Sequence, residues 1–337
     1  MINVLIDMPL YEPVYRELLN MPGIHVKRII EPEEKSRLLP NELIHDADVL
    51  LCTSPPENHE QMSCLKMIQI NTAGYKQLTG QKLEERNIIA CNALGVSDIP
   101  IAEWNIAMMI NLARDIRKII YNQETQVWDR AARFQYEIRG SVVGLWGYGG
   151  IGRETARLSK AFGLAVHVLS RNGVASRENM YCVPGTGDPE GKLPDRVFLM
   201  NEKEAFLKSV DFLIMAIPQT ANTEGIVGEH ELKLLRPGSF LLNPARGPLI
   251  KEEALIRALK EGWIAGAALD THYHYPMPPQ HPLWHMPNVI FTPHISGSTS
   301  SPHYLERVYT IFLENLKRFQ LGKPLLNQLS PSQLKGN

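Results

Sequence analysis

The chain has 337 residues, of which 44% are hydrophobic and 21% are charged, close to the average of globular proteins. Its 35 basic and 36 acidic residues give a net charge of -1, which excludes the long-range positive field of a protein that binds nucleic acid or an anionic membrane. At about 100–200 residues per domain, this length predicts two domains.

The chain carries no membrane or export signal that we can identify. No apolar run reaches the roughly 18 residues of a spanning helix. The first apolar stretch contains Asp7 and lacks the basic residues that begin a signal peptide. The four cysteines are scattered, without a CxxC pair or metal-ligand spacing. We therefore expect a cytoplasmic protein with reduced thiols, no membrane partner and no metal site.

Short apolar runs alternate with helical patterns along most of the chain. The runs that predict strands are Ile2–Asp7, His25–Ile30, Asp48–Cys52, Lys66–Asn71, Ile88–Cys91, Ser141–Trp146, Ala165–Ser170, Phe212–Ala216, Ser239–Leu242, Ala265–Leu269 and Val289–Phe291. The predicted helices include Tyr11–Leu19, Pro40–His45, Ile151–Phe162, Glu252–Glu261 and Ser301–Gln320. This alternation predicts an α/β fold with parallel sheets covered by helices on both faces.

Three segments depart from that alternation. A long helical pattern runs from about Ile99 to Trp128 and divides the chain into two α/β series. Residues 172–201 are rich in Gly, Pro and Asp and predict an inserted surface loop. The last residues, LNQLSPSQLKGN, predict a frayed tail.

The segment from Gly147 to Gly152 has the glycine spacing of a dinucleotide-binding loop. It follows a predicted strand and opens a predicted helix, which is the context that such a loop requires. Gly147 permits the tight turn, Gly149 admits the pyrophosphate, and Gly152 lets the helix pack on the strand. The amides at the helix start, from Gly150 and Ile151 onward, would bind the pyrophosphate. The alternative is a glycine-rich connection without a ligand.

The end of the next strand indicates which cofactor the chain prefers. An acidic residue about 20 residues beyond the glycines would bind the ribose 2′-hydroxyl of NAD, but Ser170 and Arg171 stand there. A hydroxyl and a guanidinium would bind a 2′-phosphate instead. We therefore expect NADP to be preferred, with NAD possible as well. The alternative is that Arg171 points into solvent and selectivity is weak.

Six ordered blocks resemble the D-isomer-specific 2-hydroxyacid dehydrogenases, a family that includes glyoxylate/hydroxypyruvate reductases. These blocks are INTAGYKQL, VSDIPIAEW, GYGGIG, LLNPARGPLI, GAALD and HPLWHMPNVIFTPHISGST. The resemblance implies a Rossmann-type doubly wound cofactor domain, residues 99–296, inserted in a smaller flavodoxin-like α/β substrate domain, residues 1–98 plus 297–337. It also implies a two-fold homodimer that pairs through the long helix.

Two residues carry the chemistry that hydride transfer to a 2-oxo acid needs, namely a cation and a proton donor. Arg246 follows an apolar strand, and its planar guanidinium can hold a carboxylate and a carbonyl oxygen. His294 follows another strand and ionises near neutral pH. The resemblance gives them these roles, and it makes the backbone of Ala73 and Gly74 a clamp for the substrate carboxylate. It also implies that the cofactor contacts Pro218, Thr223, Ala245, Asp270 and His294.

Tyr275 departs from the pattern of the family. The usual catalytic glutamate stands five positions after the aspartate, and here the fifth residue after Asp270 is Tyr275. Formate dehydrogenases also lack that glutamate, but Ser97 stands where they place a substrate-binding asparagine. Tyr275 is therefore the candidate partner of His294.

These observations predict an NADP-preferring oxidoreductase that reduces a small 2-oxo acid to a 2-hydroxy acid, or runs the reverse oxidation. The small carboxylate would be held by Arg246, with His294 as the acid or base. One alternative is a dehydrogenase of a small anion such as formate or phosphite. A second is a catalytically inactive, NADPH-sensing binding protein, although sensing would need neither Arg246 nor His294.

The long helix also indicates the partner. It carries more apolar residues than one helix usually buries in its own domain, and the arm RAARFQYEIRG follows it. We therefore expect a homodimer; the alternative is a core helix packed within the chain. The apolar residues in question are Trp104, Ile106, Met108, Met109, Ile110, Ile119 and Ile120.

Overall fold

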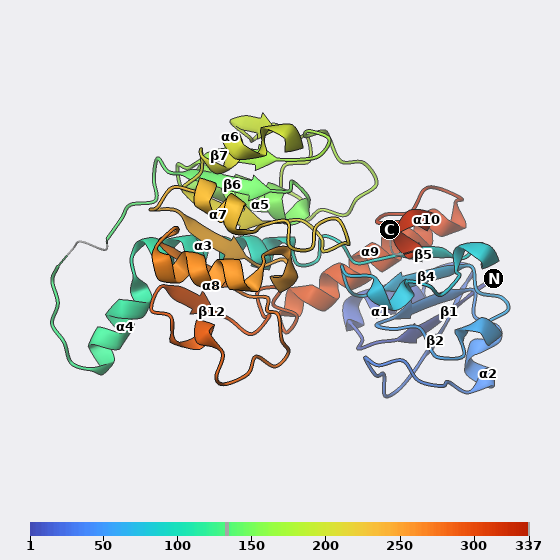
Figure 1. Ribbon diagram of the computed structural model, residues 1–337. Helices are drawn as coiled ribbons and strands as arrows, with labels where there is room; N and C mark the ends of the chain where they lie inside the picture. The colour runs from blue at the N-terminus through green and yellow to red at the C-terminus, as the bar shows by residue number, and fades with distance from the viewer. Residues whose placement is uncertain (132–134, 336–337) are drawn as a thin grey trace. The chain divides into compact units, whose positions relative to one another are not determined.

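The computed structural model describes residues 1–131 and 135–335 and divides the chain into two compact units (Figure 1). Unit 1 comprises residues 1–97, 178–181 and 299–337, and unit 2 comprises residues 98–177 and 182–298. Each unit is built on one parallel sheet.

The sheet of unit 1 has the strand order β2-β1-β3-β4-β5, and its strands are parallel. They are β1 (Ile2–Asp7), β2 (Ile24–Arg28), β3 (Val49–Cys52), β4 (Met67–Ile70) and β5 (Ile89–Cys91). The helices of this unit are α1 (Glu12–Leu19), α2 (Asn41–Ile44), α9 (Pro302–Gln320) and α10 (Pro331–Leu334).

Alternate residues of β1 show why the sheet of unit 1 needs cover on both faces. Val4 and Ile6 are buried in one apolar cluster with Phe312 of α9, whereas Leu5 is buried in a second cluster with Ile44 of α2. Successive side chains of a strand point to opposite faces, so a strand that is buried on both sides must be apolar throughout.

The sheet of unit 2 has the order β12-β11-β10-β9-β6-β7-β8, again entirely parallel. This is the doubly wound arrangement, in which the chain leaves the first strand in one direction and later returns to its other side. The strands are β6 (Val142–Trp146), β7 (Ala165–Leu169), β8 (Arg196–Phe198), β9 (Phe212–Met215), β10 (Phe240–Asn243), β11 (Gly266–Leu269) and β12 (Val289–Phe291).

Helices cover both faces of the second sheet, and the predicted α/β class with parallel sheets is confirmed. The residues of β9 alternate between two apolar clusters: Phe212 and Ile214 lie in one, and Leu213 and Met215 in the other. The helices of unit 2 are α3 (Asp98–Ala113), α4 (Ile116–Glu124), α5 (Gly150–Ala161), α6 (Lys203–Leu207), α7 (Glu229–Leu234) and α8 (Glu252–Glu261).

The single long helix predicted over 99–128 is wrong, because the chain breaks it between α3 and α4. Asp115 has a φ of 44°, in the left-handed region that Asp tolerates better than most residues. Ile106 and Met109 of α3 are buried in the core of unit 2 rather than exposed. No residue of α4 is buried, and α4 stands away from the sheet of unit 2 in Figure 1.

The insertion is shorter than the predicted 172–201 and is better ordered. Residues 196–198 form the edge strand β8, which pairs with β7, and a helical turn follows at Met200–Glu202. Residues 178–181 belong to unit 1, where the Asn327 amide donates to the Asn179 carbonyl (3.0 Å) and the Tyr181 amide donates to Asn327 Oδ1 (3.1 Å). The turn residues of this segment predict a loop. The order of the segment could not be predicted, because its hydrogen-bonding partner Asn327 lies far away in the sequence.

The predicted frayed tail is also wrong for the residues that the structure describes. Leu326, Leu329 and Leu334 are buried, and α10 begins with a capping box at Ser330. The tail has no clear periodicity, so its sequence did not predict burial, but Leu329 and Leu334 pack in an apolar cluster with strands of unit 1. Residues 336–337 of that tail, and 132–134 of the predicted arm, lie outside the described residues.

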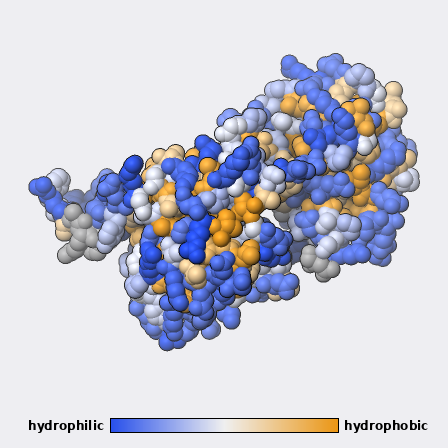
Figure 2. All heavy atoms as spheres, turned by 90° about the horizontal axis from the view of Figure 1, so that it is seen from above, coloured by the Kyte–Doolittle hydropathy of each residue, from blue (hydrophilic) through white to orange (hydrophobic). Residues whose placement is uncertain are grey.

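Across the described part of the chain, we find no helix that is both long enough and apolar enough to cross a bilayer. On the face shown in Figure 2, hydrophilic residues predominate and apolar residues gather in patches between them.

Candidate active site

The glycine loop joins β6 to α5, and steric contacts explain two of its glycines, Gly147 and Gly152. Gly147 has a φ of 104°, and a Cβ there would lie 2.4 Å from the Ala216 carbonyl oxygen. A Cβ on Gly152 would lie 2.7 Å from the carbonyl oxygen of Gly147, so helix and strand pack closely. Gly149 instead faces open space, with no atom within 4 Å of an added Cβ. The loop thus fits a pyrophosphate at the start of α5.

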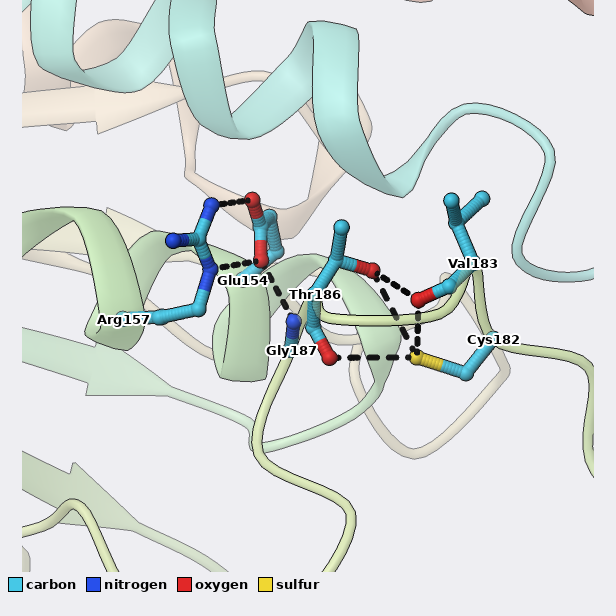
Figure 3. A network of polar contacts seen from close by, with 6 residues as sticks. All are labelled: Glu154, Arg157, Cys182, Val183, Thr186 and Gly187. Carbon is cyan, nitrogen blue, oxygen red and sulfur yellow. Dashed lines mark hydrogen bonds and ion pairs between the residues drawn. The ribbon is translucent and has the colours of Figure 1, made fainter.

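The insertion packs against this glycine loop. The Tyr148 hydroxyl donates to Asp188 (2.6 Å), and the buried Arg153 guanidinium donates to the carbonyls of Tyr148, Ala175 and Asp188. In Figure 3, the Glu154 carboxylate of α5 accepts hydrogen bonds from the Gly187 amide and the Arg157 guanidinium. The insertion is therefore a structural support of the loop, which its composition did not indicate.

At the end of β7, only one of the two predicted 2′-phosphate ligands presents a donor to solvent. The Ser170 hydroxyl donates to the Gly173 carbonyl (2.8 Å), so its proton is already engaged. Arg171 is exposed. Any preference for NADP at this position would therefore depend mainly on Arg171.

The two loops after β9 and β10 are each closed by one polar side chain. The Thr223 hydroxyl donates to the Pro218 carbonyl (2.8 Å) and accepts from the Thr220 amide (2.8 Å). The buried Asn243 accepts from the amides of Ala245 (3.1 Å) and Arg246 (3.3 Å) and donates to the Arg246 carbonyl (2.8 Å). Asn243 thus fixes the backbone that carries Arg246, and sequence reasoning missed it.

Asp270, at the end of β11, is fully buried and holds the loop of His294. Its carboxylate accepts from the Thr292 hydroxyl (2.6 Å), the Ile295 amide (2.9 Å) and both the amide (3.0 Å) and the hydroxyl of Ser296. These four bonds span the chain on either side of His294. Thr292 and Ser296 are further residues that the sequence analysis did not single out.

His294 lies in a backbone conformation that this loop imposes on it. Its φ is 59°, and its amide donates to the Thr292 carbonyl (3.0 Å). The residue is exposed to solvent. Partial burial of the ring, and secondly the positive charge of Arg246, lower the pKa of His294 below its usual range. Arg246 and His294 thus follow the carboxyl ends of β10 and β12, which lie on either side of β11 in the sheet.

Tyr275 adjoins His294, with their ring centroids 5.6 Å apart. Its hydroxyl accepts a hydrogen bond from the His272 amide (3.1 Å), so the phenol oxygen is directed toward its own loop. His272 is buried, contacts the Phe291 ring at 4.1 Å and bonds through Nε2 to the Thr292 carbonyl (2.7 Å). The side chain of this loop that lies beside His294 is therefore a phenol and not a carboxylate.

In unit 1, the loop after β4 presents two backbone amides. The Asn92 side chain donates to the Ala73 carbonyl (2.7 Å), and the Thr72 hydroxyl donates to the Gly74 carbonyl (2.7 Å). Neither the Ala73 amide nor the Gly74 amide donates to another described residue. Amides without a partner beside fixed carbonyls can bind an anion such as a carboxylate.

The comparisons with known proteins agree with this geometry. Residues 106–296 match the family model described as the NAD-binding domain of the D-isomer specific 2-hydroxyacid dehydrogenases. A glyoxylate reductase of Thermofilum pendens is 30% identical over 276 residues, which are 80% of this chain and 77% of that protein. A D-3-phosphoglycerate dehydrogenase of Methanocaldococcus jannaschii is 31% identical over 327 residues, 96% of this chain and 58% of that protein.

The fold also matches a solved structure, the NADPH-dependent glyoxylate/hydroxypyruvate reductase of Sinorhizobium meliloti. The TM-score is 0.70 at 23% identity, and the match covers 98% of each chain. The resemblance found in the sequence and the predicted two-sheet Rossmann-type fold are thus confirmed. This chain belongs to the D-isomer specific 2-hydroxyacid dehydrogenase family and is an NAD(P)-dependent oxidoreductase of 2-oxo and 2-hydroxy acids.

Proposed function

We propose that the chain reduces a small 2-oxo acid to the 2-hydroxy acid with NADPH, or runs the reverse oxidation, with unit 2 as the cofactor domain and unit 1 as the substrate domain. The observation that carries the proposal is that Arg246 and His294 follow β10 and β12 on loops held by the buried side chains of Asn243 and Asp270. A cation and a proton donor thus converge at one edge of the sheet of unit 2, where open parallel sheets bind their ligands.

The bound cofactor would supply the hydride. The Arg246 guanidinium would bind the substrate carboxylate and the carbonyl oxygen, on which negative charge develops. His294 in its protonated form would donate a proton to that oxygen, and in its neutral form would accept it back in the oxidation. The Ala73 and Gly74 amides are the second contact that we propose for the carboxylate.

The proposal is tested by the consumption of NADPH with glyoxylate, hydroxypyruvate and pyruvate, and separately by the reduction of NADP⁺ with formate and phosphite. Turnover of a 2-oxo acid supports the proposal. Turnover of formate or phosphite alone would assign the chain to a small-anion dehydrogenase. Binding of NADPH without turnover of any of these compounds would instead favour a sensing protein.

We expect NADPH to outperform NADH, because Arg171 stands where an acid would repel a 2′-phosphate. A charge-assisted bond contributes roughly 1.5–3 kcal/mol, which corresponds to about 10- to 100-fold in kcat/KM. Arg171→Ala should remove this preference and leave kcat/KM with NADH nearly unchanged. Steady-state kinetics with both cofactors measure the effect.

Ser170→Ala is the matched control, because its hydroxyl is already engaged with Gly173. It should change the NADPH preference much less than Arg171→Ala. Equal efficiencies with both cofactors in the unmodified protein would contradict the assignment.

Tyr275→Glu should move the alkaline limb of the reductive pH profile to higher pH. The pKa of His294 is lowered, so the protonated form that reduction requires is lost as pH rises through that lowered value. A carboxylate beside the ring favours the charged form and raises the pKa. Tyr275→Gln is the control, because it shortens the side chain without adding charge. A profile that stays in place with Glu would show that residue 275 does not act on His294.

We further propose that the chain forms a homodimer through the region around α4. Ile119, Ile120 and Trp128 are exposed, the last at 89%, and α4 buries no residue in its own unit. Light scattering at micromolar concentration should give twice the mass of 38.0 kDa. Ile120→Asp should lower that mass to one chain, whereas Ile30→Asp, at an exposed site in unit 1, should not.

The location that we propose is the cytoplasm. All four cysteines are unpaired, and Cys52 and Cys91 are buried. Reduced thiols of this kind agree with a reducing compartment.

A further inference from the structure

Three side chains outside the proposed chemistry gather beside the loop of Tyr275. Glu252 is the first residue of α8, His274 lies in the loop after β11, and His281 precedes the helical turn Pro282–His285. One ligand atom from each lies within 4.8 Å of the other two. The cluster is the only group of three or more potential metal-ligating side chains within the described residues 1–131 and 135–335.

Two of these side chains already meet. His281 Nε2 lies 2.6 Å from Glu252 Oε1, and their side chains are 9% and 28% exposed. The His274 ring lies 6.1 Å from the His281 ring between centroids and is exposed to solvent. The cluster thus has a sheltered pair on one side and an exposed imidazole on the other.

Two hydrogen bonds hold the backbone of this cluster in place. The Tyr273 hydroxyl donates to the Ile250 carbonyl (3.0 Å), which fixes the residue before His274 near the start of α8. The Trp284 indole donates to the Pro278 carbonyl (2.9 Å), which closes the segment that contains His281. The ligands therefore come from two chain segments that are already joined, so little order would have to be gained on binding.

We propose that Glu252, His274 and His281 form a binding site for a divalent transition-metal ion, with Zn²⁺ the best match. Two imidazoles and one carboxylate are a ligand set of zinc, whereas Mg²⁺ and Ca²⁺ take oxygen ligands. With metal–ligand bonds of about 2.0–2.2 Å, the donors of a tetrahedral ion lie about 3.3 Å apart. The 2.6 Å pair would open and His274 would turn inward, and water can take the fourth position on the exposed side.

Binding through His281 has one identifiable cost. His281 Nδ1 accepts a long hydrogen bond from the Leu283 amide (3.3 Å). An imidazole that binds a metal through Nε2 carries its proton on Nδ1, so this bond would be lost. The competing interpretation is that Glu252 and His281 form only a hydrogen-bonded pair that anchors the loop. The two interpretations differ in the role of His274, which is a ligand in the metal site but has no part in the hydrogen-bonded pair.

The test is a titration of the full, tag-free, chelator-treated chain with Zn²⁺ alone by calorimetry. The expected stoichiometry is one ion per chain. His274→Ala removes an exposed ligand and should weaken binding at least about 10- to 100-fold, the loss that even indirect metal contacts cause. Glu252→Gln should do the same. His303→Ala is the matched control, because His303 also pairs with a glutamate, Glu306 (2.9 Å), but has no second histidine beside it.

Two spectroscopic readouts locate the ion without any measurement of turnover. Co²⁺ in place of Zn²⁺ should give the visible absorption of a tetrahedral site in the unmodified chain and lose it in His274→Ala. Hydrogen exchange of residues 272–285 should slow when Zn²⁺ is added, because the ion joins two segments. The proposal is overturned if Zn²⁺ does not bind, if His274→Ala binds it equally well, or if protection arises elsewhere. None of these results depends on which substrate the enzyme reduces.

Discussion

Replacing His294 by Asn is expected to lower kcat for the reduction of a 2-oxo acid by about 10²–10⁴-fold, the usual contribution of general acid catalysis. Asn is preferred to Ala because residue 294 has a φ of 59°, and Asn adopts the left-handed region with less strain. The amide cannot donate a proton near neutral pH. The variant should therefore lose the dependence of the rate on pH that the histidine produces.

Stopped-flow or steady-state measurement of NADPH oxidation checks this result. His230→Ala is a suitable control, because His230 is an exposed histidine of unit 2 whose Nε2 lies 3.6 Å from Glu204. The control should keep full activity. A His294→Asn variant with nearly normal kcat and an unchanged pH profile would show that another group donates the proton.

Replacing Arg246 by Ala should lower kcat/KM by about 10²–10³-fold, the loss seen when a donor to a developing negative charge is removed. The same change has a second, independent consequence. The charge of Arg246 is one cause of the lowered pKa of His294, so its removal should raise that pKa. The alkaline limb of the reductive profile should then move to higher pH even as the rate falls.

A second variant distinguishes a chemical role of Arg246 from damage to the fold. Arg246→Lys keeps the positive charge but loses the planar fork, so it should recover the position of the pH profile and only part of kcat/KM. If Arg246→Ala moved neither the rate nor the profile, the carboxylate would be held elsewhere. Thermal unfolding of each variant should stay close to that of the parent, because Arg246 is exposed.

The segment from Asp270 to Ser296 shows what could not be predicted from the sequence. His294 could be identified by the block in which it stands and Tyr275 by its spacing from Asp270, and the structure places their rings together. The bonds from Asp270 to Thr292, Ile295 and Ser296 were not visible in the sequence. They join residues at least 22 positions apart through side chains that also occur in ordinary turns.

The metal-ligating cluster was missed for a related reason. The chain has no paired cysteines and no short metal-ligand spacing that its sequence would reveal. Glu252 lies 22 residues before His274, and only the docking of the β11 loop beside α8 brings them together. A spacing rule detects ligands on one element, and these three come from two segments, α8 and the loop after β11.

Local patterning by itself determined most of the strands and helices, the glycine turn before α5 and the absence of an acid at the end of β7. These features depend on side chains a few residues apart, so periodicity and turn chemistry are sufficient to predict them. Tertiary structure decided the rest: the break at Asp115, the burial of the C-terminal leucines and the packing of the insertion on Tyr148 and Arg153. Each of these depends on apolar or hydrogen-bonding partners that are distant in the chain, and the free energy of such contacts overrides weak local preference.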